Sequence, residues 1–183
     1  MANKVKFGLK NVHVYEIEKN DHTGTTYKAG FRIPGAVDLV LSAQGSENIF
    51  HADDMVYWGA FTNGGYSGDL EIALIPEKFE IDIMGNTKDS NGAIVESIDA
   101  KPKPFAMAFE FSGDANAVRH ILYNVAASRP DIAGHTVEDK TDPKTDKIKI
   151  IASAKNDGVI KAKLEQGQTG YDTFFDAPYV VTP

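Results

Sequence analysis

Cysteine is absent from this 183-residue sequence, and so are long apolar segments. Without cysteine the chain has no disulfide, no cysteine-ligated zinc and no thiol nucleophile. The first residues, MANKVKFGLKNVHVYEI, carry charges every few positions and lack the continuous apolar core of a signal peptide. No uncharged apolar run is long enough to span a bilayer. We therefore expect a soluble, unprocessed chain made in a reducing cytoplasm, with no membrane partner.

An excess of positive charge is also lacking. The chain has 19 Lys and Arg against 26 Asp and Glu, a formal net charge of −7 at pH 7. A protein that grips nucleic acid needs clustered basic residues, whereas here they are scattered. The composition argues against specific DNA binding but allows DNA to pass nearby without sticking. The length fits one domain over residues 1–183.

Patterns that carry catalysis are missing as well. None of the five histidines has the spacing of a metal site, and no glycine loop for phosphate precedes a helix. His51 with Asp53 and Asp54 is more typical of a turn than of a catalytic base. A carboxylate pair such as Glu71 and Glu110 stays open, because such partners meet only in the fold. We expect no enzyme activity, no catalytic or cofactor-binding residue and no metal site.

Alternation with period two is the dominant pattern, and it predicts β-strands. The phase changes between Leu9 and Val12, which predicts a bulge in one long strand. Between residues 105 and 111, four large apolar residues share one face and Ala106, Ala108 and Glu110 the other. Asn156–Asp157–Gly158, between the alternating segments 147–154 and 159–164, predicts a hairpin.

One helix is expected over residues 76–84. Pro76 suits its start, Gly85 suits its end, and Phe79 and Ile83 fall on one face. Eight or nine strands with one flanking helix predict a mainly β fold, an antiparallel β-sandwich or partly open barrel.

Residues 42–68 combine glycines with large aromatic residues. Loops are usually polar, so this stretch predicts an extended arm loop whose rings need a surface to bury them. The rings either fold back onto the parent core or form an interface with another chain. The candidate anchors are Tyr57, Trp58, Phe61 and Tyr66.

Four segments carry a resemblance to a known family: FGLKNVHVYEI at 7–17, IPGAVDLVL at 33–41, NGGYSGDLEIALIP at 63–76 and AKPKPFAMAFEFSGDANAVRHILYNVAASRP at 100–130. Together they resemble the major tail proteins, or tail tube proteins, of bacteriophages with long non-contractile tails, of the phi13 and TP901-1 type. The resemblance extends over nearly the whole chain and is weakest over 134–143 and after residue 167.

The resemblance implies a structural virion protein. Such proteins form hexameric rings that stack head-to-tail into the tail tube, a conduit for DNA ejection into the host. It implies that residues 42–68 are an inter-ring arm with Tyr57, Trp58, Phe61 and Tyr66 as anchors. An acidic lumen would let DNA slide, and Glu71, Glu110 and Asp157 are candidates to line it.

The partners and location follow from the same resemblance. The chain would bind itself, a tape-measure protein inside the tube, and tail terminator and distal tail proteins at the ends. It would be assembled in the bacterial host cytoplasm and reside in the virion tail, with no cofactor.

Two other classes of function remain as alternatives. A carbohydrate-binding or host-adhesion β-sandwich would use Tyr57 and Trp58 as platforms that stack on sugars. A β-sandwich hydrolase would use dispersed carboxylates.

Overall fold

The computed structural model describes residues 7–132 and 144–182, and in them the chain is mainly β. One short helix, α1 (Glu77–Asp82), accompanies the strands. The mainly β, antiparallel fold class predicted from the sequence is confirmed. The strands are β1 (Leu9–Asp21), β2 (Gly24–Tyr27), β3 (Phe31–Ile33), β4 (Ala36–Gln44), β5 (Glu47–Ala52), β6 (Met55–Phe61), β7 (Gly65–Ile72), β8 (Thr87–Lys88), β9 (Ile94–Val95), β10 (Phe105–Phe111), β11 (Arg119–Ala127), β12 (Asp146–Ser153) and β13 (Lys161–Leu164).

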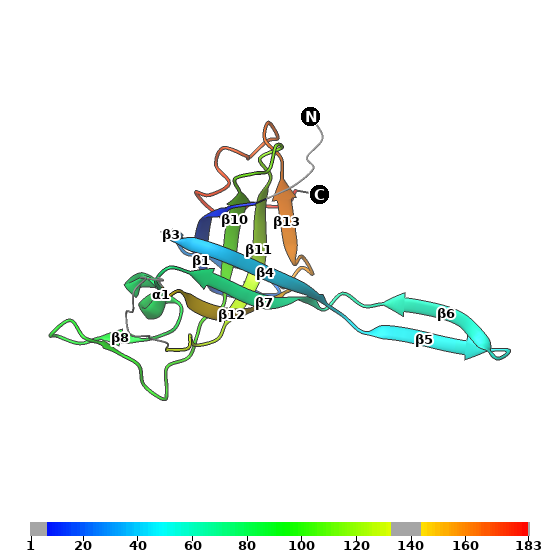
Figure 1. Cartoon of the computed structure of the whole chain (residues 1–183), viewed down its shortest axis with the longest axis horizontal. Coiled ribbons are helices and arrows are strands. Elements are labelled where there is room, and N and C mark those ends of the chain that lie inside the picture. Colours follow the sequence, from blue (N-terminus) through cyan, green and yellow to red (C-terminus); the bar gives the residue numbers. More distant parts are fainter. Residues whose placement is uncertain (1–6, 133–143, 183) are drawn as a thin grey trace, which may run out of the picture.

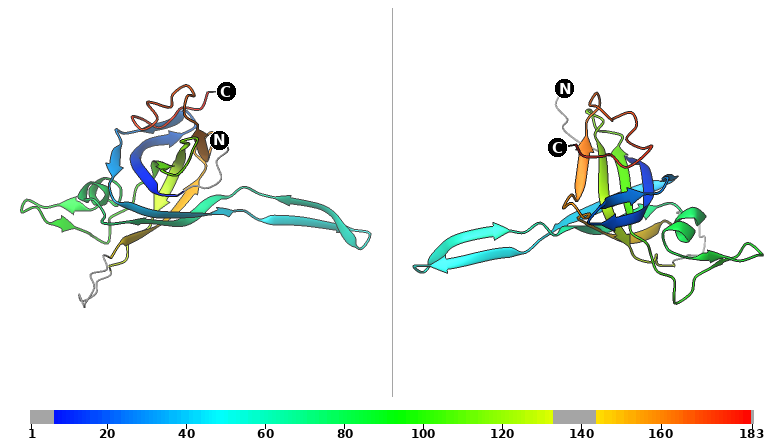
Figure 2. Two further views of the ribbon diagram at one scale, coloured as in Figure 1. Left: turned by 45° about the horizontal axis from the view of Figure 1, so that its top comes forward. Right: turned by 180° about the vertical axis from the view of Figure 1, so that it is seen from behind.

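Nine of these strands form one antiparallel sheet in the order β2-β1-β10-β11-β12-β7-β4, with β3 also paired to β1 and β13 also paired to β11 (Figure 1). The sheet curls until β1 approaches β4, but no hydrogen-bonded ladder joins those two strands among the described residues. It is therefore not a closed barrel. Two separate pairs, β5-β6 and β8-β9, extend from opposite sides of this body (Figures 1 and 2).

The long first strand bends where the hydrophobic phase changes. Its register with β10 shifts between Lys10 and His13, and Asn11 has a positive φ of 53°. The Asn11 side-chain amide donates to Glu110 Oε1 at 2.7 Å, which holds the bulged residue in place. The predicted bulge is confirmed, and it lets β1 wrap around the sheet to pair with β10, β3 and β2.

The main core lies inside the curl. β7, β10 and β12 each contribute alternate side chains, and α1 adds Phe79 and Ile83. The Phe79 ring meets Phe105 edge-on with 5.8 Å between centroids. The predicted helix is confirmed with slightly narrower bounds, and Gly85 follows it with a φ of 81°. The buried members of this core include Val12, Val14, Ile33, Leu70, Ile72, Met107, Phe109, Leu122, Val125, Ile148 and Ile150.

A second core lies on the other face of β10 and β11. Ala106 and Ala108 face it, together with Tyr15 and Tyr123, so this face of β10 is buried as well. Residues 165–182, which form neither strand nor helix, cover it with Tyr171 and Phe174. The two faces of β10 were assigned correctly from the alternation, but the burial of the alanine face was not anticipated.

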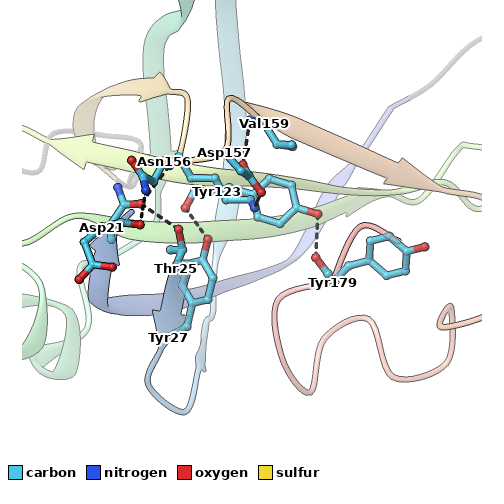
Figure 3. Close-up of polar contacts among 10 residues, drawn as sticks. Asp21, Thr25, Tyr27, Tyr123, Asn156, Asp157, Val159 and Tyr179 are labelled. Atoms are coloured by element: carbon cyan, nitrogen blue, oxygen red, sulfur yellow. Dashed lines mark hydrogen bonds and ion pairs between the residues drawn. The ribbon is translucent and has the colours of Figure 1, made fainter. Parts of the chain in front are cut away.

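The hairpin predicted at residues 156–158 is wrong, although its turn exists. Gly158 has a φ of 85°, as the turn requires. However, β12 and β13 do not pair with each other: both pair with β11, one after the other along its length. The intervening loop instead contacts the β1–β2 turn, where the Asn156 backbone N–H donates to Asn20 Oδ1 at 3.0 Å and its side chain donates to Asp21 O (Figure 3).

Candidate functional site

The region predicted as an arm loop is a β-hairpin that projects from the body. β5 and β6 pair with each other and pack against no other element to any large extent within the described residues (Figures 1 and 2). Residues 42–44 belong to β4 and residues 65–68 to β7, so the prediction of a loop over 42–68 is corrected. We call residues 45–64 the arm.

Local geometry explains why the arm forms a hairpin. Asp53 and Asp54 connect the two strands and both have positive φ, 51° and 58°, as a two-residue turn of type I′ requires. At the base, Thr62 N donates to Ser46 O at 3.0 Å, and Ser46 N donates to Thr62 Oγ1 at 2.8 Å. A Cβ atom on Gly45 would lie 2.0 Å from Thr62 O, so only glycine allows the strands to approach this closely.

The arm exposes an aromatic surface. Tyr57 is 70% exposed, Trp58 54% and Phe61 81%. Phe50 lies opposite Trp58 across the hairpin and meets the Tyr57 ring edge-on at 6.4 Å. A two-stranded hairpin is marginally stable alone in water, and exposed apolar patches of this kind mark interaction sites. The other large apolar residues exposed on the arm are Ile49, Met55 and Val56.

Tyr66, the fourth predicted anchor, belongs to the body and not to the arm. It lies in β7, is half-buried and packs against the main core. Its hydroxyl accepts a hydrogen bond from Lys161 Nζ at 2.5 Å, and that ammonium also lies 4.4 Å from the ring centroid. Tyr66 therefore lies in the body, where β7 begins after the arm.

The negative charge of the chain is concentrated in the segment that carries the arm. Residues 33–77 contain seven Asp and Glu and no Lys or Arg. The remaining sequence then holds 19 acidic and 19 basic residues and is formally neutral. The total charge alone does not reveal that residues 33–77 are acidic and the rest of the chain is neutral. The absence of Lys and Arg over 33–77 can nevertheless be read directly from the sequence.

A groove opens in the body where the sheet divides. The second half of β11 pairs with β12, which in turn pairs with β7. The first half of β11 pairs with β13, which does not pair with β7. The gap exposes part of the main core in a groove of about 240 Å³, which we call the wedge. Leu39, Leu41 and Tyr66 line one side, Lys161 the other, and Phe111 and Leu122 the floor.

Two of the three predicted lumen residues lie on the surface. Glu71 points outward from β7 and forms an ion pair with Lys147 at 3.1 Å. Hydrogen bonds from Thr145 and Lys147 lower the pKa of Glu71 below its ordinary value. Asp157 lies in the loop before β13, where the hydrogen bond from Lys155 lowers its pKa (Figure 3). Whether either residue faces a lumen stays a prediction.

Glu110 does not fit the role of a lumen residue, because its side chain is only 8% exposed. It is paired with Arg119 at 3.2 Å and with Lys10 at 3.4 Å. Arg119 in turn lies over the Tyr171 ring at 3.9 Å and donates to the Tyr171 carbonyl. Glu110 therefore helps to hold the C-terminal segment and offers no open acidic surface.

The described residues do not assemble a catalytic pair from the predicted carboxylates. β12 and β11 separate β7 from β10, and the strand registers place Glu71 and Glu110 near opposite ends of β11, so the two carboxylates lie more than roughly 14 Å apart at ordinary strand spacing. The carboxyl groups of a glycosidase lie within roughly 5–9.5 Å of each other. In the described part of the chain, no group of three His, Asp or Glu is placed to hold a metal ion, and no helix is long and apolar enough to cross a membrane.

No model of a known protein family matches this chain, and no curated protein matches it either.

Proposed function

We propose that this chain is a structural subunit that polymerises into stacked hexameric rings and forms the tail tube of a bacteriophage. The tube would conduct DNA during ejection, with a tape-measure protein inside and terminator and distal tail proteins at its ends. The proposal joins the family resemblance of the sequence to features of the structure that call for a second copy of the chain.

The projecting arm is the observation that carries the proposal. It exposes Tyr57, Trp58 and Phe61 on a hairpin that has no other element to pack against in the described residues. Burial of such rings stabilises an interface by roughly 25 cal/mol per Å² of apolar area removed from water. An arm that leaves one surface and binds a different surface of the next copy gives a heterologous contact, which builds rings or open-ended tubes.

The edge of the main sheet supports lateral association. β4 ends the strand order, so in the described residues no strand forms a ladder with its outer edge, although β1 approaches it. Val37 and Val40 in β4 are at least half exposed. Unpaired strand edges with apolar side chains favour pairing with another chain. The concentration of negative charge over residues 33–77 suits a surface past which DNA must slide without binding.

Purified full-length protein tests the proposal by negative-stain electron microscopy and sedimentation velocity. We expect rings about one subunit high and hollow tubes, in proportions that depend on protein concentration. A protein that stays monomeric at every concentration up to the millimolar range would contradict a tube-forming role.

A carbohydrate-binding or host-adhesion module is the second candidate, since Tyr57 and Trp58 are exposed neighbours on a ribbon. A glycan array separates the two functions. A glycan bound by a monodisperse monomer, with binding lost in Trp58→Ala, would favour adhesion over tube formation.

A further inference from the structure

We propose that the wedge of one subunit receives the arm of a second copy of this chain, with the acidic tip of the arm against the lysines of β13. This inference rests on the proposed function and assigns the receiving surface, which the arm alone does not define. It commits to a head-to-tail contact between two different surfaces of the same chain.

The wedge leaves part of the main core open to solvent between apolar and polar side chains, and Lys161 contacts Tyr66 across it. Leu39 and Leu41 on one side and Phe111 and Leu122 on the floor are continuous with the main core. The subunit cannot cover the wedge with its own arm, because the arm points away from the body in every view (Figures 1 and 2). A second copy supplies an aromatic hairpin of the kind that buries such a surface.

Charge selects this surface as the acceptor. Lys161 and Lys163 stand on the same side of β13, and neither forms an ion pair within the described residues. The arm carries Glu47, Asp53 and Asp54 and no Lys or Arg, and its turn places the two aspartates at the tip. Complementary charges of this kind fix the register of an interface and suppress other modes of contact.

The backbone offers a second point of complementarity. Among residues 7–132 and 144–182, β13 pairs with β11 alone, which leaves its other edge without a partner strand there. In the same described ranges β5 and β6 pair with each other alone, so each has one edge without a partner strand. An arm laid along β13 could therefore extend the sheet by strand addition while its rings fill the wedge.

Two variants separate the arm from the wedge. In the arm-replaced variant, residues 45–64 are exchanged for Asn-Gly; because Gln44 and Gly65 are paired across β4 and β7, a two-residue turn can close this hairpin. In the wedge variant, Lys161→Glu and Lys163→Glu reverse the charge beside the groove. Lys144→Glu with Lys149→Glu is the matched control, since both residues are exposed and have no ion pair in the described residues.

Sedimentation velocity of the variants, alone and mixed, tests the proposal. We expect the wedge variant to need at least roughly tenfold more protein to assemble, whereas the control assembles like the original chain. The wedge variant still has an arm and the arm-replaced variant still has a wedge. At a protein concentration where neither variant assembles alone, their mixture should therefore form a complex with equal amounts of both.

A charge-exchange variant is the last part of the test. Asp53→Lys with Asp54→Lys, introduced into the wedge variant, should restore assembly to within a few-fold of the original chain. Restored assembly also proves that the variant folds. If the wedge variant assembles normally, or if exchange and mixing both fail while the original chain forms tubes, the arm binds elsewhere and the wedge assignment is overturned. If the original chain forms no rings or tubes at all, the proposed function fails instead.

Discussion

The arm and the C-terminal segment 165–182 show opposite relations between regular structure and burial. The arm is two hydrogen-bonded strands, yet its large side chains are exposed. The C-terminal segment has no strand or helix, yet it buries Tyr171 and Phe174 in the second core. These two regions show that a paired strand can be exposed and that a segment without strand or helix can contribute to a core.

Hydroxyl and guanidinium groups replace strand ladders in the C-terminal segment. Tyr15 donates to Phe175 O at 2.7 Å. Tyr123 donates to Tyr179 O, also at 2.7 Å (Figure 3). Burial of the Tyr15 and Tyr123 rings raises the pKa of each hydroxyl well above its ordinary value, so these hydroxyls remain protonated donors even in alkaline solution where an exposed tyrosine ionises. The segment is thus held by side chains from the sheet beneath it, whereas the arm is held by the hydrogen bonds of its own backbone.

Replacing a phenylalanine by alanine in the C-terminal segment and in the arm should give the largest difference in stability. Phe174 is 1% exposed and Phe61 is 81% exposed. We expect Phe174→Ala to lower the free energy of unfolding by about 3–5 kcal/mol, because it leaves a cavity in the second core. Phe61→Ala should change it by less than about 0.5 kcal/mol while weakening assembly. Urea denaturation and sedimentation of both variants measure the two effects, and an equal loss of stability would remove the distinction between the regions.

Replacing a buried glutamate of the body and an exposed glutamate of the arm by glutamine should give a smaller difference in stability. Glu110→Gln breaks the buried pairs with Arg119 and Lys10, and we expect a loss of about 2–3 kcal/mol in the free energy of unfolding. Glu47→Gln removes an exposed carboxylate of the arm that has no ion pair in the described residues, so stability should change by less than about 0.5 kcal/mol. A Glu110→Gln variant as stable as the original chain would show that the pairs only offset the desolvation of the charges.

Ion pairs in the body should also make stability depend on pH. Burial of Glu16 opposes its ionisation, but hydrogen bonds from Lys28 and Lys103 outweigh burial and lower its pKa. The unfolded chain then binds more protons than the folded chain in acid, so stability is present above the ordinary glutamate pKa and is lost as the pH falls. Glu16→Gln should lower stability by about 1–2 kcal/mol at pH 7 and flatten this acid dependence. Urea midpoints measured between roughly pH 3 and 7 test both, and an unchanged slope would contradict the assignment.

The features that were predicted from the sequence depend on near neighbours in the chain. Pro76, Phe79 and Gly85 fix the helix, and the alternation over residues 105–111 fixes the two faces of β10. Tyr57, Trp58 and Phe61 were identified as candidate anchors because rings in a glycine-rich stretch need a surface to bury them, but the sequence left open whether that surface was the parent core or another chain.

The features that were missed depend on distant residues. The turn at Gly158 was found, but the choice of β11 as partner for both β12 and β13 depends on residues 23–45 positions away. The arm was not predicted as strands, because Asp53–Asp54 is not a strong hairpin signal even though both residues adopt positive φ. The second core was missed because residues 165–182 have no periodicity, and their burial depends on tyrosines in β1 and β11.

Replacing a glycine by alanine in the body and in the arm should give the smallest difference in stability. These substitutions test the effect of backbone conformation alone. Gly158 has a φ of 85° and open space around its Cβ position, so Gly158→Ala should cost about 1 kcal/mol through backbone strain only. Gly59 in the arm does not have a positive φ, and the nearest atom to an added Cβ lies 3.9 Å away. Gly59→Ala should therefore be neutral or slightly stabilising, because alanine restricts the unfolded chain. Thermal melting of both variants measures the two effects. If Gly59→Ala melts at a lower temperature than Gly158→Ala, the arm packs against a surface in the free subunit and is not exposed in solution.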